Sequence, residues 1–116
     1  MADICRLMDD PVQAQLEAYN ARDVEAFLAC YTDDCIVEDG AGTRLLTGKS
    51  EMRPRYQGLF AASPMLHAAI VHRTRIGAYV VDEQHITGRV PDMRRAVAIY
   101  RVKDGLIEHV RFLRED

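Results

Sequence analysis

The stretch VQAQLEAYNARDVEAFLACYTDDCIVEDGAG, residues 12–42, determines how the first third of the chain folds. Asp10 and Pro11 stand directly before it and are typical of a helix start, because Asp can cap and Pro suits the first helical position. Apolar residues then recur at helical spacing. The pattern breaks at 20–22, after which Asp23 can cap a second helix. The stretch therefore predicts two short helices in succession.

The end of this stretch changes to a different pattern. Residues 32–34 indicate a turn, and residues 35–38 indicate a short strand. A loop over 40–47 then leads to a third helix around 49–61, for which Ser50 is the expected cap.

The second half of the chain is rich in Val, Ile, Tyr and Thr, and turn signals divide it into four segments that we expect to be strands. They are Met65–Thr74, Ala78–Gly88, Arg94–Val102 and Leu106–Arg114. The chain contains no linker or internal repeat, so residues 1–116 are expected to form one domain. Helices followed by strands predict an α+β fold, with three N-terminal helices packed on a curved antiparallel sheet.

The segment 94–102 is apolar on both faces of its predicted strand. One face carries Ala96, Ala98 and Tyr100, and the other carries Val97 and Ile99. Three helices can cover only one side of a sheet, so the other side is expected to be covered by a second copy in a homodimer. The alternative is a modest apolar patch exposed to solvent.

Composition excludes several classes of protein. The chain has 116 residues, of which 48% are hydrophobic and 28% charged, with a net charge of −3. That charge gives no basic surface for nucleic acid or an anionic membrane. No segment is long and apolar enough to cross a bilayer, and residues 1–10 lack the apolar core of a secretory signal. We therefore expect a cytoplasmic protein.

The cysteines and histidines do not form a pattern typical of metal ligands. Cys5, Cys30 and Cys35 lack paired spacing and are expected to be reduced thiols, the alternative being a nucleophile activated by a nearby base. His67 and His72 are five residues apart in an extended segment, which puts them on opposite faces of a regular strand. We expect no metal and no cofactor.

The order of elements and two local motifs resemble the nuclear transport factor 2-like superfamily, which has a cone-shaped, cystatin-like fold. The stretch 12–42 contains Asn-x-x-Asp at 20–23 and Val-Glu-Asp at 37–39, and it resembles the opening of ketosteroid isomerases and SnoaL-like polyketide cyclases. AVAIYRVKDGLIEHVRFL, residues 96–113, resembles the final hairpin of the same superfamily. The resemblance implies an internal apolar pocket for a small hydrophobic ligand. It also implies a cofactor-independent isomerase, cyclase or dehydratase, or else a binding protein without catalysis.

The resemblance also suggests site residues. The general base of ketosteroid isomerases matches Asp39, and two tyrosines that support the pocket match Tyr31 and Tyr56. The family's oxyanion donors match Gln15, which still donates a hydrogen bond, and Ala98, which does not. True ketosteroid isomerase activity is therefore not expected.

Asp39 is the expected proton acceptor, because an apolar pocket mouth raises the pKa of a carboxylate and makes it a better base. It would remove a proton next to a carbonyl, with Tyr31, Tyr56 or Gln15 donating to the oxyanion. The alternative is that Asp39 and Gly40 form a turn in which the carboxylate bonds its own backbone.

Other polar residues are weaker candidates for the site. His67 is a candidate proton shuttle as in the dehydratases of the superfamily, the alternative being a structural histidine. Four tyrosines either line the pocket or pack in the core: Tyr19, Tyr31, Tyr56 and Tyr100. Three basic pairs are either solvated or dimer-rim charges or a site for a carboxylate-bearing ligand: Arg53-Arg55, Arg73-Arg75 and Arg94-Arg95.

Two functions follow from these residues. One is a lyase or isomerase acting on a small apolar carbonyl compound, with Asp39 as base. The other is a non-catalytic dimer that binds a hydrophobic ligand or a protein partner. A dimer without a pocket is a third outcome if large side chains fill the cone.

Overall fold

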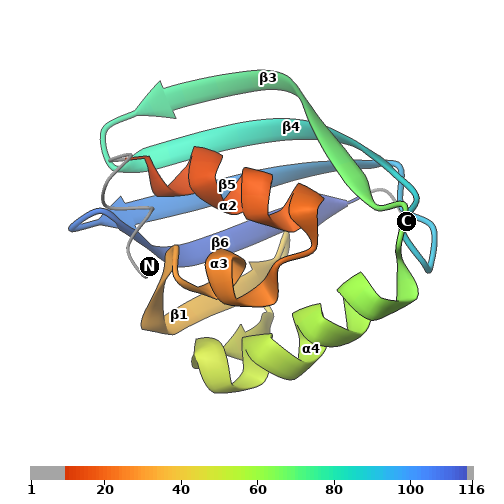
Figure 1. The fold of residues 1–116 in the computed structure, drawn as a ribbon. Helices are drawn as coiled ribbons and strands as arrows, with labels where there is room; N and C mark the ends of the chain where they lie inside the picture. Colours follow the sequence, from red (N-terminus) through yellow and green to blue (C-terminus); the bar gives the residue numbers. More distant parts are fainter. Residues whose placement is uncertain (1–9, 115–116) are drawn as a thin grey trace.

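The computed structural model describes residues 10–114, which form three helices and six strands (Figure 1). The helices are α2 (Pro11–Ala21), α3 (Val24–Leu28) and α4 (Gly48–Ala62). The strands are β1 (Tyr31–Asp39), β2 (Arg44–Thr47), β3 (His67–Ile76), β4 (Tyr79–Thr87), β5 (Arg95–Lys103) and β6 (Leu106–Arg114).

The first two helices begin where the sequence predicts, but α3 ends at Leu28, so the prediction that the second helix extends to Tyr31 is wrong. The Asp10 carboxylate accepts the N–H of Gln13 at 3.2 Å, and the Asp23 carboxylate accepts the N–H of Ala26 at 3.1 Å. Between the helices, Arg22 is in the left-handed conformation at φ 55°, which ends α2 and turns the chain. Both predicted caps are confirmed.

Helix α4 begins earlier than predicted. Thr47 rather than Ser50 stands at its N-cap, and the Glu51 carboxylate accepts the Thr47 N–H at 2.8 Å. Gly48 has a positive φ of 77°, and a Cβ there would lie 3.0 Å from the carbonyl oxygen of Asp33. The close approach of α4 to β1 therefore requires glycine at this position.

The sheet has the strand order β2-β1-β6-β5-β4-β3. Strands β1 and β6 pair in parallel and the other neighbours are antiparallel, so the prediction of a purely antiparallel sheet is wrong at this pair. The predicted loop 40–47 contains β2, and the predicted turn 32–34 lies inside β1. The polar residues 32–34 lie where the β1–β6 register shifts between Tyr31 and Ile36. Pairing of β1 with a distant strand therefore overrides their turn propensity.

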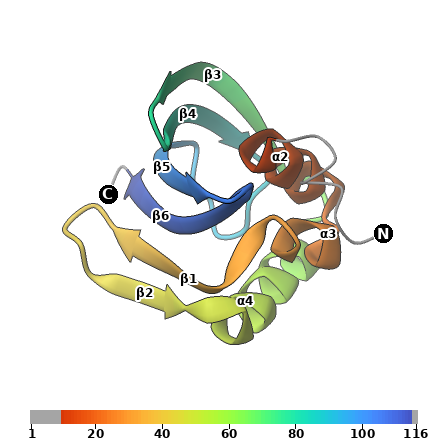
Figure 2. The ribbon, with the colours of Figure 1, turned by 90° about the vertical axis from the view of Figure 1, so that its left-hand side faces the viewer.

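The sheet curls from β2 at one edge to β3 at the other, and the helices lie on its concave side (Figures 1 and 2). The predicted α+β arrangement of three helices against one curved sheet is confirmed. The largest side chains of the core fill the space between the two layers: Val12, Phe27, Leu28, Tyr31, Met52, Leu66, Tyr100 and Ile107.

The two faces of β5 differ in burial as alternation requires. Ala96, Ala98 and Tyr100 are buried on the concave side, whereas Val97 and Ile99 are half-buried on the outer side. The homodimer through this outer face stays a prediction.

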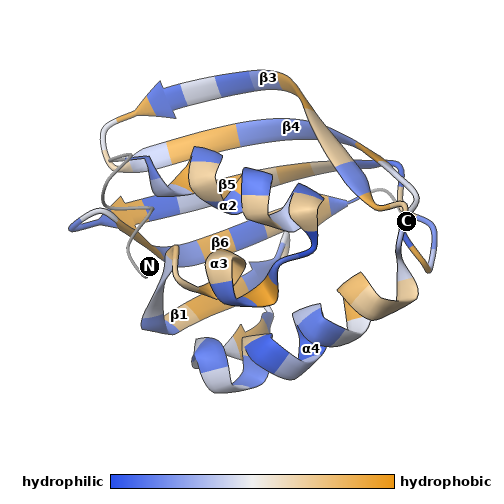
Figure 3. Cartoon of the chain, in the orientation of Figure 1, coloured by the Kyte–Doolittle hydropathy of each residue, from blue (hydrophilic) through white to orange (hydrophobic). Residues whose placement is uncertain are grey.

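In Figure 3, α4 is hydrophilic along its first turns and more hydrophobic toward its end. Its hydrophilic part includes Arg55, which belongs to the site described next.

Candidate functional site

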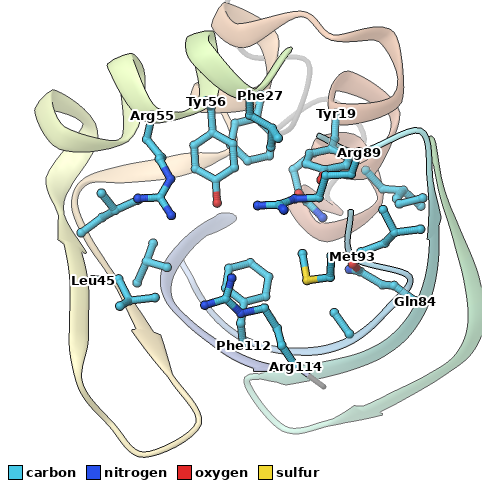
Figure 4. A pocket seen from close by; sticks show the side chains of 18 of the residues that line it. Tyr19, Phe27, Leu45, Arg55, Tyr56, Gln84, Arg89, Met93, Phe112 and Arg114 are labelled. Atoms are coloured by element: carbon cyan, nitrogen blue, oxygen red, sulfur yellow. The ribbon is translucent and has the colours of Figure 1, made fainter. Parts of the chain in front are cut away.

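A hollow of about 90 Å³ lies between the concave side of the sheet and the helices, and it opens to solvent at one end (Figure 4). Much of its lining is apolar: Leu16, Phe27, Val37, Leu45, Leu46, Leu59, Ala68, Ile86, Met93, Ala96 and Phe112. The polar lining consists of amides, phenols and guanidinium groups: Gln15, Gln84, Tyr19, Tyr31, Tyr56, Tyr100, Arg55, Arg89 and Arg114. Large side chains therefore do not fill the cone completely.

The buried end of the hollow carries a hydrogen-bonded network. Gln15 Nε2 donates to the Tyr100 hydroxyl at 3.1 Å, and Gln84 Nε2 donates to the same hydroxyl at 3.3 Å. The Tyr31 hydroxyl donates to Gln15 Oε1 at 3.2 Å. All four side chains are buried, with relative exposures between 2% and 7%. The network joins α2 to β1, β4 and β5, and it fixes the polar groups at the closed end.

Tyr100 is the group in this network best placed to donate to a ligand. Its oxygen accepts two amide hydrogens, so its own hydrogen is left for an acceptor in the hollow. Burial raises the pKa of Tyr100 well above that of a free phenol, and the negative charge of Asp82 adds to the effect. The hydroxyl is therefore protonated at any physiological pH and acts as a hydrogen-bond donor.

Aromatic rings form one wall of the hollow. Phe27 lies at its centre, with ring centroids 4.5 Å from Tyr56 and 4.9 Å from Tyr31. Tyr19 and Phe60 pack edge to face at 5.5 Å beside them. These rings come from α2, α3, β1 and α4, so the wall is fixed by the packing of all three helices on the sheet.

Three arginines surround the open end. Arg55 projects from α4, Arg89 from the segment after β4, and Arg114 from the end of β6 (Figure 4). Burial raises the pKa of Tyr56, and the positive charges of Arg55 and Arg89 both oppose that rise. The opening of the hollow is thus positively charged.

The lining of the hollow contains no Asp, Glu, His or Cys among residues 10–114. Asp39, the predicted base, is the last residue of β1 and precedes the turn to β2. Its Oδ1 accepts the N–H groups of Ala41 at 3.0 Å and Thr43 at 2.9 Å, and it is not a lining residue. These bonds support the turn interpretation of Asp39.

The other predicted site residues divide into two groups. Gln15, Tyr31 and Tyr56 line the hollow together, although their roles toward a ligand stay predictions. His67 is exposed at the start of β3 and pairs with Thr87, outside the lining.

The bulge in β3 changes where its second histidine points. The β3–β4 register shifts between Ile70 and His72, so His67 and His72 both lie on the outer face, and the prediction of opposite faces is wrong. Within the described part of the chain, no group of three or more His, Cys, Asp or Glu side chains could hold a metal ion.

Neither Cys30 nor Cys35 lines the hollow. Cys35 is a buried free thiol whose pKa is raised to about 12, mainly by burial and then by the charges of Asp34 and Glu108. It is therefore protonated at neutral pH, which does not support a nucleophilic role. Cys30 is disulfide-bonded, so the expectation of a reduced thiol there is wrong, and Cys5 lies outside the described residues. A cytoplasmic location stays a prediction, and the cysteines no longer support it.

Sequence reasoning missed a buried carboxylate next to the hollow. Asp82 on β4 is 0% exposed. Its Oδ1 accepts a hydrogen bond from Arg73 Nε at 2.6 Å, and its Oδ2 accepts one from Arg73 Nη2 at 2.8 Å. Arg73 also donates to Gln13 Oε1 at 2.8 Å, which connects β3 and β4 to α2. The signal was present in the sequence, because Asp82 alternates with the apolar Val80 and Ile86 on one strand face.

Sequence reasoning also missed Gln84, Arg89 and Arg114 as lining residues. Gln84 lies on the same inward face of β4 as Asp82, so strand alternation could have found it. Arg89 and Arg114 are far apart along the chain and meet only because β4 and β6 end at the same side of the sheet. No local pattern marks them.

A curved sheet with helices on its concave side and one open hollow defines a cone-shaped α+β protein, the architecture of cystatin-like and nuclear transport factor 2-like proteins. The chain belongs to the SnoaL-like domain family, whose sequence model matches residues 12–110. No curated protein matches the chain at a significant level.

Solved structures support the same fold. An uncharacterised cystatin-fold protein from Novosphingobium aromaticivorans is 28% identical, with a TM-score of 0.80 over 90% of this chain and 95% of that one. A candidate polyketide cyclase from Sinorhizobium meliloti is 21% identical, with a TM-score of 0.75 over 88% and 92% of the two chains. A candidate ketosteroid isomerase from Kribbella flavida is 19% identical, with a TM-score of 0.75 over 91% and 76%.

None of the helices among residues 10–114 has the length and apolar character needed to cross a membrane.

Proposed function

We propose that this protein binds a small, mainly apolar molecule in the hollow of its cone and does not transform it by proton abstraction. One observation carries the proposal. The hollow combines apolar walls with buried hydrogen-bond donors, and its described lining holds no carboxylate, imidazole or thiol. Apolar walls with a few fixed polar groups are typical of ligand pockets.

The polar end of the hollow favours a ligand with an oxygen acceptor. The Tyr100 hydroxyl is held by Gln15 and Gln84, and its hydrogen can donate to a carbonyl or hydroxyl oxygen of the ligand. Because this network is fixed before the ligand arrives, little ordering is needed on binding.

The enzymatic alternative is an isomerase, cyclase or dehydratase of the kind that the family resemblance suggests. A donor such as Tyr100 would stabilise an enolate there. Proton removal also requires a base within hydrogen-bond reach of the substrate. Asp39 is the predicted base, and its Oδ1 is engaged by two backbone N–H groups of its own turn, so the geometry favours binding over turnover.

The experiment measures binding and proton exchange on the same compounds. A panel of small ketones, esters and acids is screened by thermal shift, and bound compounds are incubated with the protein in D₂O and followed by NMR. We expect binding without deuterium exchange next to the carbonyl. Exchange that Asp39→Asn abolishes would overturn the proposal and restore Asp39 as the base.

A matched pair of variants tests the position of the ligand. Tyr100→Phe removes the buried hydroxyl and should weaken binding of a carbonyl compound by about threefold to tenfold, since one hydrogen bond contributes about 0.5–1.5 kcal/mol. Tyr79→Phe makes the same chemical change at an exposed position on the outer face and should leave the affinity unchanged. Equal effects of the two variants would show that the ligand accepts no hydrogen bond from Tyr100.

A further inference from the structure

The arginines at the opening of the hollow differ from most arginines of the chain in their partners. Seven other arginines form ion pairs with carboxylates: Arg53, Arg73, Arg75, Arg94, Arg95, Arg101 and Arg111. Within residues 10–114, Arg55, Arg89 and Arg114 form none, although Arg89 donates to the Pro91 carbonyl oxygen. Three positive charges therefore border an apolar hollow whose lining, within residues 10–114, includes no acidic residue.

This arrangement is unfavourable without an anion. Like charges at one opening repel each other, and low-dielectric walls beside them concentrate the positive potential. Arg89 also lies against Tyr19, since its charge and hydrogen bonding oppose the rise that burial causes in the pKa of Tyr19. Arg89 is thus held at the opening by neighbouring groups, and the residue is only half exposed.

We propose that the ligand of this hollow is an apolar carboxylate, with its hydrocarbon or aromatic body inside and its carboxylate between Arg55 and Arg89, assisted by Arg114. This inference rests on the proposed binding function and adds the chemical class of the ligand. Guanidinium groups suit this role because their paired N–H donors match the two oxygens of a carboxylate.

The two ends of the hollow then recognise different parts of one molecule. Arg55 and Arg114 are exposed and Arg89 is half-buried, so the anion keeps partial contact with water and its desolvation cost stays low. The buried Tyr100 hydroxyl can donate to an oxygen at the other end of the body. A small acid with a keto or hydroxyl oxygen remote from its carboxylate satisfies both ends.

The test compares acids with neutral compounds of the same shape. Matched pairs of carboxylic acid and primary amide, on phenylalkyl and naphthyl bodies of increasing size, are titrated by calorimetry at low salt and again at high salt. For the pair whose body fits, we expect the acid to bind about tenfold tighter than its amide at low salt. The advantage should shrink at high salt, because screening lengths fall from about 10 Å at 0.1 M to about 3 Å at 1 M.

Variants then locate the anion. Arg55→Gln and Arg89→Gln together should bring the acid to within about twofold of its amide while leaving the affinity of the amide unchanged. Arg101→Gln makes the same substitution on the outer face, where Arg101 pairs with Glu108, and should preserve the preference for the acid. Circular dichroism checks that each variant is folded. If the double variant does not fold, Arg55→Gln alone, at an exposed position, should still reduce the preference for the acid, by a smaller factor.

Each outcome decides between the two proposals. Equal affinities of acid and amide in the unmodified protein would overturn the carboxylate inference and leave the binding function standing. A preference for the acid that survives the double variant would also overturn it, because the anion would then lie elsewhere. Failure of every pair to bind would overturn the binding function together with this inference.

Discussion

Replacing Arg73 by Met tests the energetics of the carboxylate buried beside the hollow. In the folded protein Asp82 is 0% exposed, and Arg73 donates to both of its oxygens, at 2.6 Å and 2.8 Å. Among residues 10–114, no other hydrogen-bond donor to the Asp82 carboxylate is present. Arg73→Met therefore leaves a buried carboxylate without a partner.

The structure sets the size of the effect. Breaking a buried ion pair by removing one partner costs about 3–5 kcal/mol, a large part of the 5–15 kcal/mol that stabilises a typical domain. Asp82→Asn should cost less, about 1–2 kcal/mol, because the Arg73 side chain is 17% exposed and can keep its charge hydrated. Arg101→Met breaks the exposed pair with Glu108 and should cost at most about 1 kcal/mol.

Urea unfolding followed by circular dichroism measures these differences. The double variant Arg73→Met with Asp82→Leu should recover much of the lost stability, because it removes both charges and replaces them with apolar groups. If Arg73→Met destabilises no more than Asp82→Asn does, the reasoning is refuted, since the buried carboxylate would then have found water or another donor.

Three further predictions concern other parts of the molecule. The Glu38 carboxylate accepts hydrogen bonds from Arg111 at 3.0 Å and His109 at 2.8 Å, and these bonds lower the pKa of Glu38. The ionised Glu38 therefore stabilises the folded protein at pH values above its unfolded pKa, and this stabilisation is lost as the pH falls through its folded pKa. In urea unfolding across pH 6 to 3, the stability difference between the unmodified protein and Glu38→Gln should shrink, and a constant difference would contradict this. Cys35, with a pKa of about 12, should react with iodoacetamide at pH 8 far more slowly in the folded protein than in urea, and equal rates would show that it is accessible. Sedimentation equilibrium at micromolar concentration should give a homodimer that Ile99→Lys dissociates, and a monomeric unmodified protein would contradict the predicted interface.

The parts of the fold that the sequence predicts are those encoded within a few residues. The caps at Asp10 and Asp23 depend on local hydrogen bonds, and both are observed. Strand β2 escaped prediction because its stability depends on pairing with β1. The parallel pairing of β1 with β6 joins segments about as far apart as the chain allows, and no local signal specifies it.

The same distinction separates the site residues. The family resemblance alone points to Gln15, Tyr31 and Tyr56 as site residues, and all three line the hollow. Asp39 follows Val37 on the same face of β1, yet its carboxylate turns back to the N–H groups of the following loop. The side-chain direction at a strand end depends on the turn that follows, which strand alternation does not describe.

Two polar clusters attach helix α2 to the sheet, and their positions explain how the hollow stays open. In the first cluster, the Gln13 side chain accepts a hydrogen bond from Arg73, which also pairs with Asp82. In the second, two residues further along the same helix, Gln15 donates to the Tyr100 hydroxyl and accepts from the Tyr31 hydroxyl. These directional bonds fix the height and rotation of α2, whereas apolar side chains alone would allow it to settle into the empty space. The double variant Arg73→Met with Asp82→Leu should therefore bind ligand more weakly even where it is as stable as the unmodified protein. Undiminished affinity in that stable variant would show that the Gln15 cluster alone positions the helix.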